Sequence, residues 1–419
     1  MDTQLTDTPR HAVETVFRIE SPRIIATVTR LVRDVGIAEE LAQDALVAAL
    51  EQWPRDGVPD NPGAWLTATA RRRAVDLIRR REVYARKLAE IGRDLSETAP
   101  PASYEYEEAD DFDDDVLRLV FMACHPVLSP ESRTTLTLRL LGGLTTAEIA
   151  RAYLAPEATV AQRIVRAKRT LATRNVAFEV PHGPDRAARL DSVLDVIYLI
   201  FNEGYAATAG DDWLRPALCE DALRLARRLT ALMPGEPEVH ALASLLEFQA
   251  SRTPARTAPD GTLVLLRDQD RHRWNRLLLT RGIEALSRAR STTTGAPGRY
   301  TLQATIAACH AHATTYKDTD WQAITRLYDA LATRFPSPVV ELNRAVALSM
   351  TAGPAAALTL LDTLATEPAL KDYHLLPSVR GDLLERLGRT EEARAEFARA
   401  ARLAGNGRER ELLARRAAN

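Results

Sequence analysis

Cysteine is scarce in this chain and occurs in no pattern that would hold a metal ion or a disulfide framework. The three cysteines, Cys124, Cys219 and Cys309, lie far apart, and none belongs to a Cys-x-x-Cys pair or a Cys/His cluster. Zinc sites and disulfide-rich folds need closely spaced ligands or many cysteines. We therefore expect three small apolar side chains in a reducing compartment, and neither a metal nor a cofactor.

Long apolar stretches and aromatic residues are also in short supply. No run approaches the roughly 20 apolar residues that span a bilayer, and the opening MDTQLTDTPR lacks the pattern of a signal peptide. We expect a cytoplasmic protein without a membrane partner. Aromatic residues make up 5% of the chain, while Ala, Leu and Arg dominate. This composition predicts an all-α fold.

An excess of charge of one sign is missing as well, because the formal net charge is -2. The chain as a whole is therefore not a generic polyanion binder. The charges are nevertheless unevenly distributed: basic clusters lie at Arg71–Arg81 and Arg163–Arg174, and an acidic block lies between them at Glu105–Asp115. A nucleic-acid phosphate backbone interacts with the charges on the protein face nearest to it. These basic clusters are therefore candidate nucleic-acid surfaces.

The 419 residues are too many for one ordinary core, and breaks in periodicity divide them into four blocks. Residues 8–81 predict several helices, interrupted by a breaker-rich loop, Pro54–Pro62. Asn61, near the end of this loop, is a candidate cap for the next helix. Residues 82–115 predict a Pro-rich, acidic linker. Residues 116–175 are helical again, and residues 185–415 form helix after helix.

The last block contains a weak internal repeat with a period of about 34–36 residues. Small residues recur where paired helices must approach closely, as in a tetratricopeptide (TPR) repeat, although any Ala-rich helical hairpin can imitate the pattern. The skeleton is clearest in Gly381, Leu384, Gly388, Ala393, Phe397 and Ala400, and again in Ala345, Leu348, Ala352, Ala357, Leu361 and Leu364.

The most specific local pattern is a helix-turn-helix within Gly143–Leu171. Thr145 or Thr146 can cap a short helix, with Glu148 in its first turn. A second helix is expected from about Ala158, with Val160, Ile164 and Ala167 facing inward. Its outer face would read a major groove through its N-terminal end, and the alternative is a helical hairpin with a solvated basic face. The candidate DNA-contacting residues are Thr159, Ala161, Gln162, Arg163, Arg166, Lys168 and Arg169.

This stretch resembles domain 4 of the RNA polymerase sigma factors of the extracytoplasmic-function (ECF) type. The family pattern reads Gly-Leu-Ser/Thr, Glu-Ile-Ala, Thr-Val and Arg-Ala-Arg/Lys, and the matching residues are Gly143, Leu144, Thr145, Glu148, Ile149, Ala150, Thr159, Val160, Arg163, Arg166, Ala167, Lys168 and Leu171. The resemblance implies that this domain recognises the minus-thirty-five promoter element. Ala161 departs from the positive or small polar residue that the family often has.

The segment Ala38–Leu46 is similar to a helix of sigma domain 2. In the family that helix docks on the clamp of the polymerase β′ subunit, which makes Glu39, Glu40, Gln43 and Asp44 the candidate core-binding residues. The alternative is a solvated acidic helix face of no special function.

The next helix resembles the sigma helix that faces the minus-ten element, with Arg73 where the family commonly has Asn. The preceding loop matches the position that captures a flipped base. Trp65 has a second interpretation as a core residue. The candidate minus-ten residues are Asn61, Trp65, Arg71, Arg72, Arg73, Arg79 and Arg80.

The remaining chain resembles the TPR-like extension of one ECF group, through Phe201–Tyr205, Pro336–Ala347 and the terminal repeat. No Ser/His/Asp order, phosphate loop or HExxH motif is present, so we expect no enzyme. Asn202, Glu203 and Tyr205 form a polar group in an apolar context, for which packing or ligand binding is the expected role.

The resemblance implies a sigma factor that binds core RNA polymerase through the β′ clamp and β flap, recognises both promoter elements and initiates transcription. The C-terminal array is expected to set its activity and is a candidate site for an unknown protein or ligand. The alternative is a TPR-containing DNA-binding regulator or scaffold that does not bind core polymerase. Domain 2 distinguishes the two, because a conventional regulator has no use for it.

Overall fold

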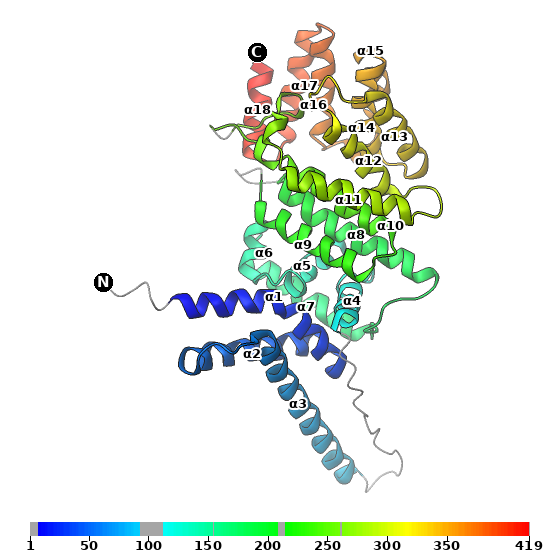
Figure 1. Ribbon diagram of the computed structural model, residues 1–419. Helices are drawn as coiled ribbons and strands as arrows, with labels where there is room; N and C mark the ends of the chain where they lie inside the picture. The colour runs from blue at the N-terminus through cyan, green and yellow to red at the C-terminus, as the bar shows by residue number, and fades with distance from the viewer. Residues whose placement is uncertain (1–6, 93–111, 154, 208–213, 260–261, 419) are drawn as a thin grey trace, which may run out of the picture. The chain divides into compact units, whose positions relative to one another are not determined.

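The structure is a computed structural model that describes residues 7–92, 112–153, 155–207, 214–259 and 262–418 (Figure 1). Within those ranges the regular structure is helical, with no strand beyond one isolated bridge, so the all-α prediction is confirmed. No helix among these residues is both long and apolar enough to cross a membrane. The chain separates into two compact units, residues 1–196 and 197–419, which are described in turn.

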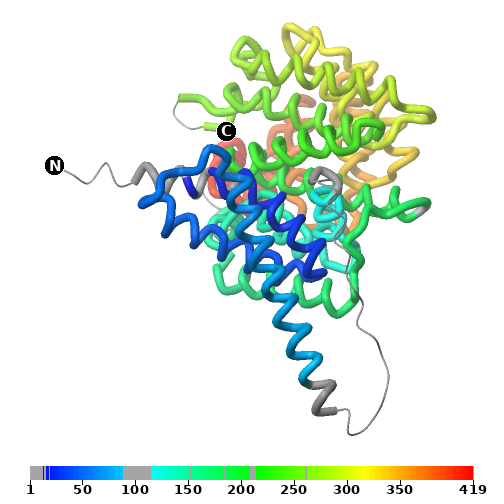
Figure 2. Tube along the Cα trace, turned by 60° about the horizontal axis from the view of Figure 1, so that its bottom comes forward, coloured from blue at the N-terminus to red at the C-terminus, as the bar shows by residue number. Residues whose placement is uncertain are grey.

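The N-terminal unit contains seven helices among the described residues and the first half of an eighth. In chain order they are α1 (Asp7–Val32), α2 (Val35–Asp56), α3 (Pro62–Gly92), α4 (Phe112–Ala123), α5 (Pro130–Leu140), α6 (Thr146–Ala152), α7 (Glu157–Thr173) and α8 (Pro184–Tyr205). Helix α1 packs against both α2 and α3, and α3 continues well beyond this three-helix bundle (Figure 2).

Local side-chain chemistry sets where these helices begin. The Asp34 carboxylate accepts a hydrogen bond from Gly36 N at 2.7 Å and starts α2. The Asn61 side chain accepts one from Ala64 N at 3.0 Å and starts α3, which confirms the predicted cap. Trp53 is buried in the bundle, and its ring packs edge-on against that of Trp65, with the ring centroids 5.5 Å apart.

Helix α1 is continuous through Pro22. Two features of the N-terminal unit differ from the sequence expectations. Helix α2 extends to Asp56 and so includes the first residues of the expected loop. Helix α3 extends to Gly92 because residues 82–92 are mostly good helix formers, so the linker prediction applies to residues 93–111, which lie outside the described ranges.

The first half of α8 packs with α4 and α5 in the same unit. Ser192 Oγ donates to the carbonyl of Cys124 at 2.6 Å, and Arg133 donates to Ser192 Oγ. Arg189 Nη2 donates to the carbonyl of Phe121 at 3.2 Å. The N-terminal unit therefore extends beyond the helix-turn-helix region into α8.

The C-terminal unit continues with α8 and ten further α-helices among its described residues. They are α9 (Pro216–Leu232), α10 (Pro237–Ser251), α11 (Arg276–Thr292), α12 (Arg299–His312), α13 (Trp321–Arg334), α14 (Pro338–Thr351), α15 (Pro354–Leu364), α16 (Leu375–Arg386), α17 (Thr390–Leu403) and α18 (Gly407–Ala418), with short 3-10 turns between some of them. From α12 onward each helix packs on the next.

The small residues of the repeat are where helices pack most closely. A Cβ atom on Gly381 of α16 would lie 2.6 Å from Phe397 Cε1 of α17, so glycine permits this contact. Ala345, Ala357 and Ala400 are fully buried in the same hydrophobic cluster as Phe397. In this part of the array the small residues lie where helices pack closely, as the repeat pattern predicted.

The polar group at the end of α8 has a packing role. The Glu203 carboxylate pairs with Arg215 at 2.5 Å, and the Arg256 guanidinium stacks over the Tyr205 ring at 3.5 Å. A Cβ on Gly204 would lie 2.7 Å from Cys219 N, so this glycine lets the start of α9 approach α8. The expected role was packing or ligand binding, and these contacts agree with packing.

Two of the three cysteines are buried, as expected for small apolar side chains. Cys124 and Cys219 are buried, and Cys309 is partly exposed. Burial raises the pKa of the Cys124 thiol to about 11 and that of Cys219 to about 12, which keeps both thiols protonated and unreactive.

Candidate functional site: the polymerase and promoter surfaces

The helix-turn-helix is held by a reciprocal cap at its first helix. Thr145 N donates to Glu148 Oε2 at 2.7 Å, and Glu148 N donates to Thr145 Oγ1 at 3.1 Å, so α6 begins as predicted. In α7 the inner residues Val160, Ile164 and Ala167 are buried, also as predicted.

The opposite face of α7 carries the candidate minus-thirty-five residues. Thr159, Ala161, Gln162, Arg166 and Arg169 are exposed, and Arg163 and Lys168 are partly buried. The Arg163 charge lies close enough to Glu131 of α5 to contribute to the lowered pKa of that carboxyl, although hydrogen bonds at the start of α5 contribute more. Six of the seven candidate side chains therefore lie on the side of α7 away from its buried residues, whereas Lys168 pairs with Glu39 of α2.

Helix α2 presents an outward stripe made of residues from the predicted core-binding segment. Glu40 and Asp44 are exposed one turn apart, and Val47, 51% exposed, and Glu51 continue the same side of the helix. The carboxylates give this side of the helix a negative charge, and Val47 adds a single exposed apolar group. The stripe Glu40–Asp44–Val47 is hereafter called the acidic stripe.

Glu39 lies at the centre of an ion-pair cluster instead of on this stripe. The residue is 4% exposed. Its Oε1 accepts hydrogen bonds from Arg139 Nε of α5 at 2.5 Å and from Gln43 Nε2 at 2.8 Å, and its Oε2 pairs with Lys168 of α7. A carboxylate removed from water requires such compensation. This Glu39 cluster ties α2 to α5 and α7.

The cluster joins residues that the sequence assigned to two separate surfaces. Glu39 and Gln43 are candidate core-binding residues, and Lys168 is a candidate phosphate contact. Arg139, which completes the cluster and also donates to the Leu144 carbonyl at 3.0 Å, was not singled out from the sequence. No sequence signal reveals it, because Arg139 and Glu39 are brought together only by the tertiary fold.

A second buried carboxylate links α1 to α4. Asp115 is 1% exposed and accepts from Arg118 at 2.8 Å, and it pairs with Arg30 of α1 at 3.1 Å. The sequence placed Asp115 at the end of a solvated acidic linker, and its burial in an interface corrects that expectation. Together with the Glu39 cluster, this contact holds the region of α1–α3 against the region of α4–α7.

Helix α3 carries the candidate minus-ten residues along an extended basic face. Arg73 pairs with Asp44 at 3.2 Å, which connects this face to the acidic stripe. Two further exposed cations, Arg86 and Lys87, extend the basic face beyond the segment singled out from the sequence, where a linker was expected. Of the candidates, those exposed are Asn61, Arg72, Arg79 and Arg80, and those partly buried are Trp65, Arg71 and Arg73.

Family models match both regions of the N-terminal unit. Sigma-70 region 2 matches residues 16–83, and Sigma-70 region 4 matches residues 118–171. A family of unknown function (DUF6596) matches residues 189–290. The first two matches contain the acidic stripe, the candidate minus-ten residues and the helix-turn-helix, whereas Arg86 and Lys87 of α3 lie beyond the region-2 match.

Similar proteins are found along the whole chain and along its N-terminal part. An uncharacterized protein of Rhizobium meliloti (strain 1021) is 42% identical over 93% of this chain and 91% of its own length. The ECF RNA polymerase sigma factor SigK of Mycobacterium sp. (strain KMS) is 30% identical over 34% of this chain and 72% of its own length. SigK of Mycobacterium ulcerans (strain Agy99) is 29% identical over 36% of this chain and 78% of its own length. No solved structure matches the chain.

Sigma factors are transcription regulators and not enzymes. Both sigma regions are present in the expected order, and the chain covers most of the length of a named ECF relative. This chain belongs to the ECF-type sigma-70 factors and carries a C-terminal helical extension.

Proposed function

We propose that this sigma factor binds core RNA polymerase through the acidic stripe of α2 and reads the promoter through α3 and α7. The observation that carries the proposal is the exposed stripe of Glu40, Asp44 and Val47 within a region-2 match. The β′ clamp is the proposed partner of this stripe, and the β flap is the proposed partner of region 4. Transcription from purified core polymerase, with and without this chain, tests the proposal.

The two DNA-reading helices must separate for this function. The minus-ten and minus-thirty-five elements lie about 25 base pairs apart, which is about 85 Å of B-form DNA. In the structure α2 contacts α7, and the Glu39 cluster joins them directly. We therefore propose that the joined arrangement is a closed form of the free chain and that promoter binding selects an open form.

Promoter readout by α7 leads to a prediction that separates base contacts from phosphate contacts. We expect Arg163→Ala and Gln162→Ala to lower transcription in a way that depends on the minus-thirty-five sequence, because a bidentate base contact discriminates by about 1–3 kcal/mol. Arg169→Ala, at an exposed phosphate-facing position, should weaken binding on all sequences and reduce its salt dependence. The measurement is in vitro transcription on a set of promoters that differ at single minus-thirty-five positions.

Thr170→Ala is a suitable control, because its hydroxyl bonds to the Arg166 carbonyl within the helix and points to no base. Equal losses for all three variants on every promoter would contradict direct readout by α7.

The C-terminal unit is proposed to set the activity of the sigma regions from within the same chain. Regions 2 and 4 suffice for promoter recognition in the family, yet residues from Ile197 onward form a separate compact unit. A covalent tether makes even weak contacts effective. We expect a chain ending at Val196 to initiate transcription at a different rate from the full chain. Ending it there retains the α8 contacts of Arg189 and Ser192, which a shorter chain would lose.

Circular dichroism and core binding of the shortened chain show whether its sigma regions are intact. Equal transcription by intact full-length and shortened chains on the same promoter would assign the C-terminal unit a role other than regulation.

A further inference from the structure

A cavity of about 650 Å³ opens in the C-terminal unit between α10, α12, α13 and α14. Leu245, Ile306 and Leu331 give it an apolar lining, and the amides of Gln303 and Asn343 also line it. A concave apolar site of this volume with a few polar groups is typical of small-molecule sites. Nothing in the sigma function described above uses this cavity.

Positive charge without a matching carboxylate distinguishes the wall of this cavity. Arg252 lines it, and among the described residues around it there is no Asp or Glu. The Arg252 guanidinium donates to Gln249 Oε1 at 3.0 Å and lies over the Trp274 ring at 5.7 Å, and both of these groups are neutral. Its Nε is buried and makes no hydrogen bond to the described residues. A second guanidinium, Arg299, lines the same cavity.

His310 adds a buried polar atom that also lacks a partner. Its Nδ1 is inaccessible and makes no hydrogen bond within the described part of the chain. Burial, and then the charges of Arg252 and Arg271, lower the pKa of His310 to about 3, so the ring is neutral near pH 7. Buried polar atoms are normally satisfied. The neutral imidazole therefore adds no second positive charge beside the Arg252 guanidinium.

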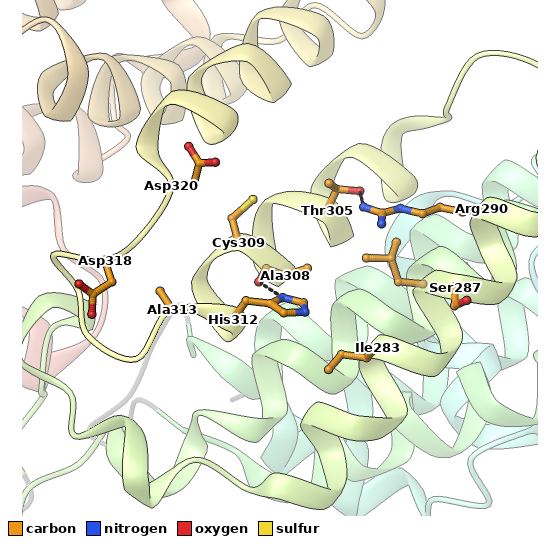
Figure 3. Close-up of a pocket in the computed structure, with 11 residues that line it drawn as sticks. Ile283, Ser287, Arg290, Thr305, Ala308, Cys309, His312, Ala313, Asp318 and Asp320 are labelled. Atoms are coloured by element: carbon orange, nitrogen blue, oxygen red, sulfur yellow. Dashed lines mark hydrogen bonds between the residues drawn. The ribbon is translucent and has the colours of Figure 1, made fainter.

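A second cavity of about 500 Å³ on another side of α12 provides a contrast (Figure 3). Its lining cation, Arg290, is accompanied by Asp318 and Asp320. The ring of His312 there contacts the Ala308 carbonyl through Nδ1 at 2.7 Å, as the dashed line shows. This cavity therefore holds two carboxylates beside its single guanidinium, and Nδ1 of its histidine has a hydrogen-bond partner.

We propose that the cavity lined by Arg252 and His310 binds a small organic carboxylate with an apolar body. The Arg252 guanidinium pairs with the carboxylate, since its fork matches the two oxygens. The apolar body lies against Ile306 and Leu331, and the His310 ring lines the same cavity. This inference concerns a ligand site in the C-terminal unit and stands independently of core binding or promoter recognition.

The test is calorimetric titration of the full chain with 2-naphthoate and with octanoate, using 2-naphthamide as the uncharged counterpart. We expect at least one carboxylate to bind with a dissociation constant of about 1 mM or lower, as ligands of this size allow. The amide should bind at least about tenfold more weakly, because it leaves the guanidinium unpaired. Arg252→Gln should abolish this preference, whereas Arg290→Gln, the matched change in the other cavity, should preserve it.

A second variant, Ala307→Phe, fills the cavity without removing a polar group and should prevent binding of both carboxylates, even if Arg252→Gln does not fold. The proposal is overturned if neither carboxylate binds at a concentration of about 10 mM, which is tenfold above the expected dissociation constant. It is also overturned if naphthoate and naphthamide bind equally, or if Ala307→Phe, with unchanged circular dichroism, leaves binding intact.

Discussion

Reversing the charge of the acidic stripe with Glu40→Arg and Asp44→Arg together should lower the affinity for core RNA polymerase by at least about 100-fold. Removing one partner of a charge pair that becomes buried in an interface costs about 2–5 kcal/mol, and reversal adds repulsion to the lost attraction. Both side chains are exposed, so the fold does not depend on burying them. The measurement is equilibrium binding to purified core polymerase, with circular dichroism to show that the helices remain.

The matched control reverses two exposed acids of the C-terminal unit, Glu391→Arg and Glu411→Arg, whose side chains are 86% and 61% exposed. It changes the net charge by the same amount. A similar loss of affinity in both double variants would indicate a general charge effect and would contradict docking through the stripe.

Arg139→Gln should shift the N-terminal unit from the closed toward the open form. The substitution removes the 2.5 Å charged hydrogen bond to Glu39, and leaves a buried carboxylate paired with Lys168 and Gln43. We expect a cost of about 2 kcal/mol to the closed form, which is a roughly 30-fold change in the closed-to-open ratio. Arg139 is chosen because it belongs to neither the predicted polymerase surface nor the predicted DNA surface.

Distance measurements between spin labels give the readout. Tyr84 in α3 and Val165 in α7 are exposed and accept labels through cysteine substitution, with the partly exposed Cys309 replaced by serine. The distance distribution should gain a longer component in Arg139→Gln. The control is Asp44→Asn, which removes a solvent-exposed ion pair between Asp44 of α2 and Arg73 of α3. Because this pair does not involve α5 or α7, the distance distribution should stay unchanged. Unchanged distances in both variants would mean that the Glu39 cluster does not hold the closed form.

Much of the secondary structure followed from local chemistry. The caps at Asn61 and Thr145, the inner face of α7 and the close contact at Gly381 were all predicted, because each depends on residues a few positions apart or on a repeated helical period. The sigma regions were likewise recognisable from short motifs.

The pairing of distant charges could not be predicted in the same way. Glu39 belongs to a segment that matches the polymerase-docking pattern, and only the fold brings Arg139 and Lys168 to it. Asp115 is similar: in sequence it ends an acidic run, and in the fold it lies buried between Arg30 and Arg118.

Equilibrium binding of the unmodified full chain to purified core polymerase, in the absence of DNA, tests the central claim most directly. The sigma-factor account predicts a saturable one-to-one complex with a dissociation constant of about 1 µM or lower, followed by transcription from a promoter that core polymerase alone does not use. A chain that binds promoter DNA but forms no complex with core polymerase would contradict the account and would instead indicate a DNA-binding regulator with a helical-repeat scaffold.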